Sequence, residues 1–290
     1  MIEVVRPGPL ATVQDLGRPG LAHLGVPRSG AADGRAFRLA NRLVGNPEGA
    51  AGVELTLGGA AFRFHRAAWI AVTGATLPVS IGGRPYGTNA PCHVPPGAVV
   101  EFGMPVSALR SYVAVRGGVA VDAVLGSRST DLLSGLGPAP LKAGDRIPLG
   151  SVRGLDPLTV DVAPGPSMPE TPVLRVLPGP RDDWFAPDAL RTLTSAVYRV
   201  SPDSNRVGVR LDGPALQRSR HGELGSEGMV TGSVQVPPSG LPIVFLADHP
   251  TTGGYPVIAV LAAASVPDAA QLRPGQRVRF SAQAGTRAGV

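Results

Sequence analysis

Short apolar runs separated by glycine, proline and polar residues recur along the whole chain. Runs of about four to eight such residues, bounded by turn-forming residues, are typical of β-strands. In the first half they predict strands at residues 2–5, 52–57, 60–64, 68–73, 78–81, 98–102, 109–115 and 146–149. In the second half they predict strands at residues 173–177, 196–200, 208–211, 232–236, 243–247, 256–261 and 277–280. Many short strands with frequent turns favour barrels or sandwiches, so we expect an all-β protein.

One long segment has the periodicity of an amphipathic helix instead. Between residues 31 and 45 the apolar side chains fall on one stripe, and Asp33 suits the first turn. A Gly-Asn-Pro sequence at residues 45–47 supplies a stop. A shorter helix is predicted around residues 187–193. We therefore expect few helices, with the 31–45 helix as the longest.

The chain of 290 residues is long enough for two domains. Residues 155–172 are rich in proline and polar residues and are the predicted linker. A similar turn followed by a strand occurs at residues 141–149 and again at 272–280, near the end of each half. We therefore predict two related β domains, residues 1–160 and 161–290, with a tail that frays from Ser281.

Composition narrows the function classes. A hydrophobic content of 43% excludes a disordered chain. The net charge of +6 comes from scattered arginines, and Lys142 is the single lysine. Basic clusters with interleaved aromatic residues are absent from the sequence, so we do not expect nucleic-acid binding. A Walker A lysine is excluded as well, because the sequence lacks the GxxxxGK pattern.

The number of cysteines and the lengths of the apolar runs indicate in which cellular compartment the protein works. The single cysteine, Cys92, excludes an internal disulfide and suits a reducing environment. The first residues lack the apolar core of a signal peptide. The longest apolar run, residues 257–266, has about half the length that a membrane span requires. We therefore expect a cytoplasmic protein that does not associate with membranes.

A loop at residues 247–256 is the densest group of chemically useful side chains. It lies between two predicted buried strands, and loops held by rigid strands are where binding groups concentrate. Its paired glycines let a backbone approach a ligand closely. The alternative is a turn whose polar residues only satisfy backbone groups. The loop carries Asp248, His249, Thr251, Thr252, Gly253, Gly254 and Tyr255.

A second polar cluster precedes the predicted 31–45 helix. Residues 12–20 lead into residues 25–33, and a loop that ends at a helix N-terminus favours anions. Arg18 offers a bidentate clamp for a carboxylate or phosphate. The alternative is that Asp15 pairs with Arg18 while Ser29 or Asp33 caps the helix.

Two further clusters complete the candidate chemistry. Residues 126–131 place hydroxyls around Arg128, and residues 225–228 are followed by a polar stretch at 235–240. A serine-hydrolase elbow is absent from the sequence. The five histidines show no metal-ligand spacing, so no metal site is expected.

These clusters, in this order, resemble a family known variously as allophanate hydrolase subunit 2, carboxyltransferase domain A/B, KipA and the C subunit of 5-oxoprolinase. The resemblance implies two cyclophilin-like β-barrel domains, in agreement with the all-β pattern. One departure is His249–Pro250, where many members carry an Arg-Gln pair. The matching stretches are residues 14–18, 25–31, 39–47, 125–131, 232–240 and 251–256.

The resemblance implies three functions. The first is the C subunit of an ATP-dependent 5-oxoprolinase, a component of a lactam hydrolase that is inactive without its partners. Those partners are a subunit 1/B-type (KipI-like) protein and a third component of the LamB/YcsF type. The second is the carboxyltransferase half of a urea carboxylase-like enzyme, with biotin carried on a partner protein. The third is a non-catalytic, KipA-like regulatory protein that sequesters a partner.

Residue chemistry assigns roles under the first hypothesis. ATP turns the amide oxygen into a phosphorylated leaving group, which leaves the protein to bind anions and move protons. We expect Asp248 to be held rigidly with its carboxylate facing a pocket. The predicted proton-handling residues are Asp15, Glu227 and Asp248. The predicted substrate- and anion-binding residues are Gln14, Arg18, Ser29, Arg128, Ser129, Thr130, Gln235, Thr251, Thr252, Gly253, Gly254 and Tyr255.

Overall fold

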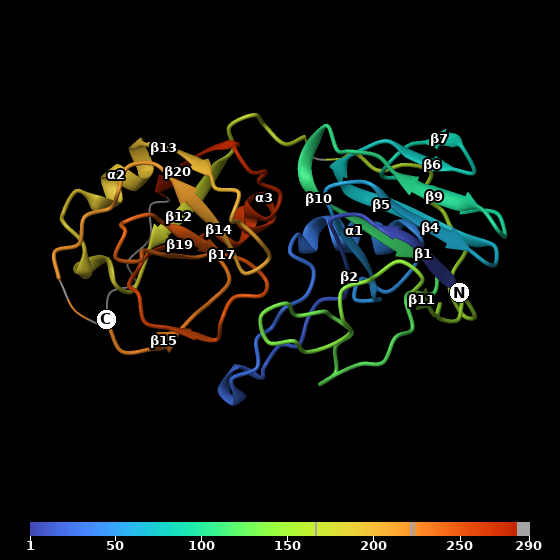
Figure 1. Cartoon of the computed structure of the whole chain (residues 1–290), viewed down its shortest axis with the longest axis horizontal. Helices are drawn as coiled ribbons and strands as arrows, with labels where there is room; N and C mark the ends of the chain where they lie inside the picture. Colours follow the sequence, from blue (N-terminus) through green and yellow to red (C-terminus); the bar gives the residue numbers. More distant parts are fainter. Residues whose placement is uncertain (166, 221, 223, 283–290) are drawn as a thin grey trace. The chain divides into compact units, whose positions relative to one another are not determined.

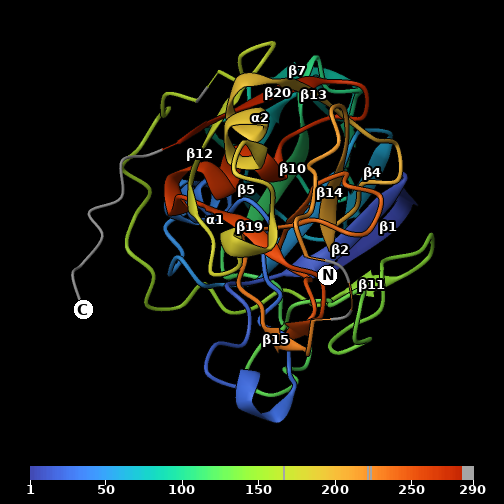
Figure 2. The same cartoon turned by 90° about the vertical axis from the view of Figure 1, so that its left-hand side faces the viewer.

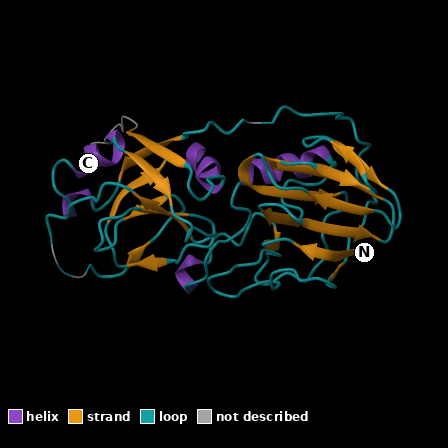
Figure 3. Ribbon diagram, turned by 45° about the horizontal axis from the view of Figure 1, so that its top comes forward, coloured by secondary structure: helices purple, strands orange, loops and turns teal. Residues whose placement is uncertain are grey.

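A computed structural model of the chain describes residues 1–165, 167–220, 222 and 224–282. Strands dominate these residues, and the α-helices are few and short (Figure 1, Figure 3). The all-β class with few helices, predicted from the sequence, is confirmed. The chain forms two compact units. The first contains residues 1–19 and 28–167, and the second contains residues 20–27 and the chain from Met168 onward.

The first unit has two antiparallel sheets whose strands come from distant parts of its sequence. The six-stranded sheet has the order β11 (Arg146–Ile147), β1 (Ile2–Pro7), β4 (Ala60–Phe64), β9 (Val99–Phe102), β6 (Val79–Ile81) and β7 (Arg84–Tyr86). The five-stranded sheet has the order β2 (Leu10–Gln14), β3 (Gly52–Thr56), β10 (Ser107–Val115), β5 (Ala68–Thr76) and β8 (Pro91–Val94).

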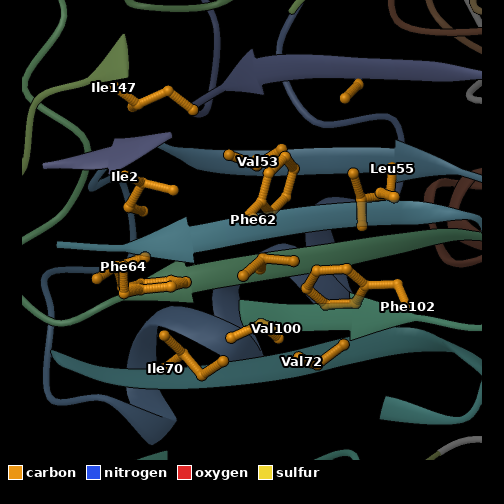
Figure 4. Close-up of a cluster of buried hydrophobic side chains, with 14 of the residues drawn as sticks. Ile2, Val53, Leu55, Phe62, Phe64, Ile70, Val72, Val100, Phe102 and Ile147 are labelled. Carbon is orange, nitrogen blue, oxygen red and sulfur yellow. The ribbon is translucent and has the colours of Figure 1, made fainter. Parts of the chain in front are cut away.

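One apolar core lies between these two sheets (Figure 4). Alternate residues of each strand point inward, as the period of two in a β-strand requires. Phe62 of β4 and Phe102 of β9 pack edge to face with ring centres 5.6 Å apart. Val53 and Val72 enter the same core from the other sheet. Cys92 also packs here, and its burial raises the pKa of its thiol.

Helix α1 (Gly34–Leu43) covers the other face of the five-stranded sheet and is the longest α-helix among the described residues. Its apolar stripe, which includes Phe37, packs against Tyr112 of β10. Asp33 is the N-cap, and its side chain accepts a hydrogen bond from the Ala36 N–H at 2.9 Å. The predicted 31–45 helix therefore forms, shortened at both ends.

Replacing Asp33 by alanine is expected to lower the free energy of unfolding of the first unit by about 1 kcal/mol, because one of the free N–H groups of α1 loses its acceptor. Urea denaturation followed by circular dichroism measures this change. Asp33→Asn, which keeps an acceptor oxygen, is the control. Equal losses in both variants would show that the carboxylate charge, and not the cap, is what stabilises the helix.

The second unit contains a closed, seven-stranded barrel (Figures 1 and 2). Around the barrel the order is β12 (Val173–Pro178), β19 (Val257–Leu261), β16 (Ser233–Gln235), β17 (Ile243–Phe245), β14 (Gly208–Asp212), β13 (Val197–Val200) and β20 (Arg277–Ala282). The barrel closes through a parallel pair, β12 with β20, whereas its other neighbours are antiparallel. A separate ribbon joins β15 (Glu227–Gly228) to β18 (Thr252–Gly253). The short helices are η1 (Ala22–Leu24), η2 (Asp182–Trp184), α2 (Ala189–Ser195), η3 (Ala263–Ser265) and α3 (Val266–Ala270).

The sequence-based prediction missed some elements. Strands β2, β7 and β8 were not predicted. The described residues of the 155–172 linker form no helix or strand. Ser281 and Ala282 belong to β20, and the rest of the predicted tail lies outside the described residues. In the described part of the chain, every helix is too short or too polar to cross a bilayer.

Candidate functional site

The polar clusters at residues 12–33 and 126–131 meet in the first unit, around the carboxylate of Asp15. Asp15 directly follows β2, and its N–H donates to Ser129 Oγ at 3.1 Å. Its Oδ1 atom accepts hydrogen bonds from the hydroxyls of Ser127 and Ser129 at 2.6 and 2.5 Å, and from the Gly17 N–H at 2.8 Å. Its Oδ2 atom accepts from the Arg128 N–H at 2.6 Å. Asp15 therefore holds residues 127–129 against the end of β2.

Three buried side chains accompany Asp15: Gln14, Arg18 and Thr130, with exposures of 0%, 2% and 2%. Gln14 Nε2 donates to the carbonyl oxygen of Thr130 at 3.0 Å. Arg18 Nη2 donates to the carbonyl oxygen of Ser129 at 2.7 Å. Both side chains are thus anchored on consecutive carbonyl groups of one segment. The alternative in which Arg18 pairs with Asp15 is wrong, because the guanidinium is bound to backbone carbonyls.

Each of these three side chains has one buried polar atom without a hydrogen-bond partner in the part of the chain that the structure describes. The atoms are Gln14 Oε1, Arg18 Nη1 and Thr130 Oγ1. Leaving such an atom unpaired costs about 1–3 kcal/mol, and more for a charged group. Unpaired groups in a native protein therefore mark places where a ligand or ordered water completes the bonds. This set offers a cationic donor, an amide acceptor and a hydroxyl, which suits a small ligand carrying an anion and an amide.

Two glycines allow the surrounding loop to close. A Cβ on Gly17, whose φ is +81°, would lie 2.4 Å from the carbonyl oxygen of Arg28. A Cβ on Gly30, whose φ is +95°, would lie 2.8 Å from the Gly17 nitrogen. Ser29 lies in this loop, and its hydroxyl donates to the Thr130 carbonyl oxygen at 3.1 Å. Ser29 is thus part of the cluster, while the capping of α1 falls to Asp33.

Arg128 joins the cluster through its backbone only. Its side chain is exposed, and its Nε donates to the Val121 carbonyl oxygen at 2.6 Å. Of the two predicted anion-binding arginines, Arg18 is therefore the buried one and Arg128 the surface one.

The polar clusters at residues 225–240 and 247–256 meet in the second unit. Glu227 of β15 lies opposite Gly253 of β18. Gln235 Nε2 donates to the carbonyl oxygen of Tyr255 at 3.0 Å. The polar loop predicted at residues 247–256 is therefore bound at two points to segments that precede it in the sequence.

Both glycines of this loop lie close to neighbouring atoms, Gly253 to a side chain and Gly254 to backbone. A Cβ on Gly253 would lie 2.9 Å from Gln235 Nε2, and one on Gly254 would lie 2.9 Å from the Leu224 carbonyl oxygen. Thr251 contributes its carbonyl oxygen to a backbone hydrogen bond, and Thr252 is exposed. The glycines therefore pack the loop against its neighbours.

Glu227 forms an ion pair with Arg181. Arg181 Nε donates to both carboxylate oxygens, at 2.9 and 3.0 Å, and its Nη2 donates to Oε1. These hydrogen bonds lower the pKa of Glu227 below its ordinary value of 4.5, and they raise the pKa of Arg181. At neutral pH the carboxylate is therefore ionised and held by a guanidinium.

Arg181→Gln is expected to raise the pKa of Glu227 toward 4.5, which carbon-detected NMR titration measures directly. A depressed carboxyl pKa contributes stability above the unfolded value, and this contribution is lost as the pH falls through the folded value. The variant should therefore lose less stability on acidification than the wild type does. Arg191→Gln, at an exposed position in α2, is the control. An unchanged pKa in Arg181→Gln would mean that the pair does not persist in solution.

Asp248 does not face a pocket, contrary to the sequence-based expectation. It is 0% exposed and forms a bidentate pair with Arg206, which is 1% exposed. Arg206 Nε donates to Oδ2 at 2.9 Å, and Nη2 donates to Oδ1 at 3.0 Å. His249 is also buried, and its ring stacks on Phe245 with centres 6.1 Å apart. The start of the loop is therefore anchored inside the second unit.

Sequence analysis missed three arginines near the predicted residues of the second unit: Arg181, Arg206 and Arg218. The guanidinium carbon of Arg218 lies 5.8 Å from the Tyr255 ring centre. Its Nε atom is buried without a partner among the described residues, and burial lowers the pKa of Arg218. These residues are isolated arginines outside any motif, so their sequence positions give no signal until the partner carboxylate or ring is located.

In the described residues, no group of three or more histidine, cysteine, aspartate or glutamate side chains is arranged to hold a metal ion. The fold and the two clusters define a mostly β protein of two units, each carrying a polar site between loops. A family model described as "Carboxyltransferase domain, subdomain A and B" matches residues 24–282. The chain therefore belongs to this carboxyltransferase-domain family, and the resemblance found in the sequence is confirmed.

Relatives of the chain carry two kinds of name. It is 37% identical to the C subunit of 5-oxoprolinase from Escherichia coli (strain K12), covering 97% of this chain and 90% of that protein. It is 33% identical to "Urea amidolyase" of Saccharomyces cerevisiae, covering 96% of this chain but 16% of that protein.

Solved structures agree with the fold. The crystal structure of TTHA0988 has a TM-score of 0.88 at 38% identity, covering 97% of this chain and 55% of that one. The K. lactis urea amidolyase has a TM-score of 0.89 at 32% identity, covering 96% of this chain and 18% of that one. The chain thus spans about half or less of these two structures.

Proposed function

We propose that this chain is the C subunit of an ATP-dependent 5-oxoprolinase that opens 5-oxoproline to glutamate in the cytoplasm. It acts with a subunit 1/B-type (KipI-like) partner and a third component of the LamB/YcsF type. The likeness to the 5-oxoprolinase component of E. coli, over most of both chains, supports this proposal. The main structural support is the set of buried polar atoms on Gln14, Arg18 and Thr130. These atoms have no hydrogen-bond partner among the residues that the structure describes.

The substrate supplies the groups that this set lacks. 5-Oxoproline has one carboxylate and one ring amide. Arg18 Nη1 donates to the carboxylate, a charge-assisted bond of the stronger kind. Gln14 Oε1 accepts the ring N–H, and the Thr130 hydroxyl donates to the ring carbonyl. ATP supplies the activation of that carbonyl oxygen.

Asp15 is a positioning residue in this scheme. Its carboxylate accepts four hydrogen bonds and fixes the segment whose Ser129 carbonyl holds Arg18. Glu227 and Asp248 form ion pairs with Arg181 and Arg206. All three carboxylates predicted to move protons are thus committed within this chain. We therefore propose that a partner protein supplies the general base and that the chain alone has no activity.

The carboxyltransferase function is the second candidate. It is favoured by the likeness to urea amidolyase over 96% of this chain. Urea has N–H and carbonyl groups that Gln14 and Thr130 can bind, whereas the anion for Arg18 would come from carboxybiotin on a partner protein. Dependence of turnover on a biotinylated partner, in place of ATP-dependent lactam opening, would select this candidate. A regulatory, non-catalytic role predicts neither activity.

Thr130→Val tests the proposed site in the reconstituted complex. Its hydroxyl has no partner among the described residues, so an isosteric apolar replacement should leave stability unchanged or slightly higher. If the hydroxyl binds substrate, kcat/KM for ATP-dependent 5-oxoproline hydrolysis should fall by about tenfold.

The matched control is Ser111→Ala. Ser111 Oγ is also buried without a partner in the described residues, but it lies in β10, outside the cluster. This variant should change neither stability nor turnover. Normal turnover in Thr130→Val would remove Thr130 from the substrate site.

A further inference from the structure

The first unit contains a cavity of about 420 Å³, separate from the Gln14, Arg18 and Thr130 cluster. Its wall includes Trp69 at the start of β5, His93 of β8 and Arg116 just after β10. Arg66 and Arg153 complete its cationic lining. The cavity shares no lining residue with the Gln14, Arg18 and Thr130 cluster, which is the site proposed for 5-oxoproline. Its volume lies in the usual range for small-molecule sites.

The charge of this cavity is of one sign. Its lining residues include three arginines and no acidic residue. Arg66 Nη2 donates to the carbonyl oxygens of Leu149 and Gly150, at 3.3 Å each. Carbonyl groups orient a guanidinium without neutralising its charge. An arginine has five N–H donors. Among the described residues, the Nε and Nη1 atoms of Arg66 have no hydrogen-bond partner, so they can bind a ligand.

Other surface hollows of the same unit differ in this respect. Two of them are lined by Arg6 and Glu101, which pair with each other at 3.1 Å. Their charge is therefore balanced within the protein. The three-arginine cavity lacks such a balance in its own lining, and it attracts anions.

An aromatic wall adds a second recognition element. Trp69 is 40% exposed, although large aromatic side chains are usually well buried. It pairs across the strands with His93, and the two rings meet edge to face with centres 5.3 Å apart. A partly exposed indole next to cationic groups is suited to stack a planar ring whose other end is anionic.

We infer that this cavity binds a nucleoside phosphate, with the base on Trp69 and the phosphates between Arg66 and Arg153. Guanidinium groups match phosphate oxygens bidentately, and stacking on an indole accepts any base. Arg116 donates to the carbonyl oxygens of Val44 and Leu155, so it serves mainly to shape the wall. The inference goes beyond the proposed function, because it places a nucleotide on this chain whether or not the chain acts on 5-oxoproline.

Calorimetric titration of the full chain with ATP, inorganic triphosphate and adenosine tests the ligand class. ATP should bind more tightly than either fragment, because it alone offers both the ring and the phosphates. Triphosphate binding as tightly as ATP would reduce the site to an anion site and overturn the inference. Binding of adenosine alone as tightly as ATP would overturn it too, by removing the role of the arginines.

Variants test the location. In a Trp184→Phe background Trp69 is the one remaining tryptophan, and its fluorescence should change on ATP binding. Arg66→Ala with Arg153→Ala should weaken ATP binding by about tenfold or more. Trp69→Ala should weaken the binding of ATP but not that of triphosphate. The matched control is Arg84→Ala, an exposed arginine of β7 outside the cavity, which should bind normally.

The outcomes separate this inference from the proposed function. Equal weakening by Arg84→Ala and by the Arg66 and Arg153 pair would indicate non-specific charge attraction and overturn the site. If the complex still hydrolyses 5-oxoproline with ATP while the cavity variants bind and turn over normally, the inference fails and the proposed function stands. If ATP binds here but the complex opens no lactam, the reverse holds.

Discussion

Replacing Asp248 by asparagine is expected to lower the free energy of unfolding of the second unit by about 3–5 kcal/mol. The substitution keeps the shape of the side chain but removes the charge that faces Arg206. Both residues are almost completely buried and are joined by two hydrogen bonds of 2.9 and 3.0 Å. Asparagine would leave the Arg206 guanidinium in a water-poor interior without the Asp248 carboxylate. Had this carboxylate faced a pocket, as expected from the sequence, the same substitution would have changed stability little.

The two tryptophans allow this effect to be assigned to one unit. Trp184 lies in the second unit and Trp69 in the first, so urea unfolding of Trp184→Phe and Trp69→Phe backgrounds follows each unit separately. The loss should appear in the Trp184 signal. Replacing the pair together, with Arg206→Met and Asp248→Leu, should recover much of the stability, since no lone charge is then buried. A loss in Asp248→Asn below about 1 kcal/mol would show that the pair is dispensable.

Arg18→Lys is expected to lower kcat/KM for 5-oxoproline by about 10²-fold or more in the reconstituted complex. Lysine keeps the positive charge but cannot hold the Ser129 carbonyl and a substrate carboxylate with one planar group. The proposal further requires that the loss depend on the substrate carboxylate. With the unsubstituted five-membered lactam, which lacks that group, wild type and variant should differ little.

This comparison is a cycle between one residue and one substrate group, and it isolates their interaction. Arg28→Lys is the control: Arg28 is exposed, and its carbonyl oxygen accepts from the Arg18 N–H at 2.8 Å. It should leave kcat/KM unchanged. If Arg18→Lys lowers activity equally with both lactams, Arg18 supports the loop and does not bind the carboxylate.

The strands were predictable where side-chain alternation and turn residues agree. Residues 60–64 were predicted with the bounds that β4 has, because the run is apolar and bounded by glycine and charged residues. Strand β2 was missed because proline and glycine flank it closely, which lowered its apparent β character. Strands β15 and β18 have two residues each and form through pairing with each other. Local sequence cannot specify such pairs, because contacts between segments distant in the sequence stabilise them.

The polar clusters were also predictable, but their partners were not. Loop composition located Gln14, Arg18 and Thr130, whereas the hydrogen bonds that join residues more than a hundred positions apart come from the fold. The expected role of Asp248 changed for the same reason. A carboxylate in a glycine-rich loop has the same sequence signature whether it faces a pocket or a buried arginine.

The parallel pair of β12 and β20 has a consequence for how the protein is made. These strands are the first and last of the barrel in the second unit, with Val173 opposite Arg279 and Val176 opposite Ala282. Domains emerging from the ribosome fold from the N-terminal end as their residues become available. The barrel of the second unit cannot close until its final strand is translated. Until then β12 and β13 present open edges that invite pairing with other chains. A polypeptide that ends before Arg277 would therefore have a first unit with all its strands. Its second unit would lack β20, so the barrel could not close.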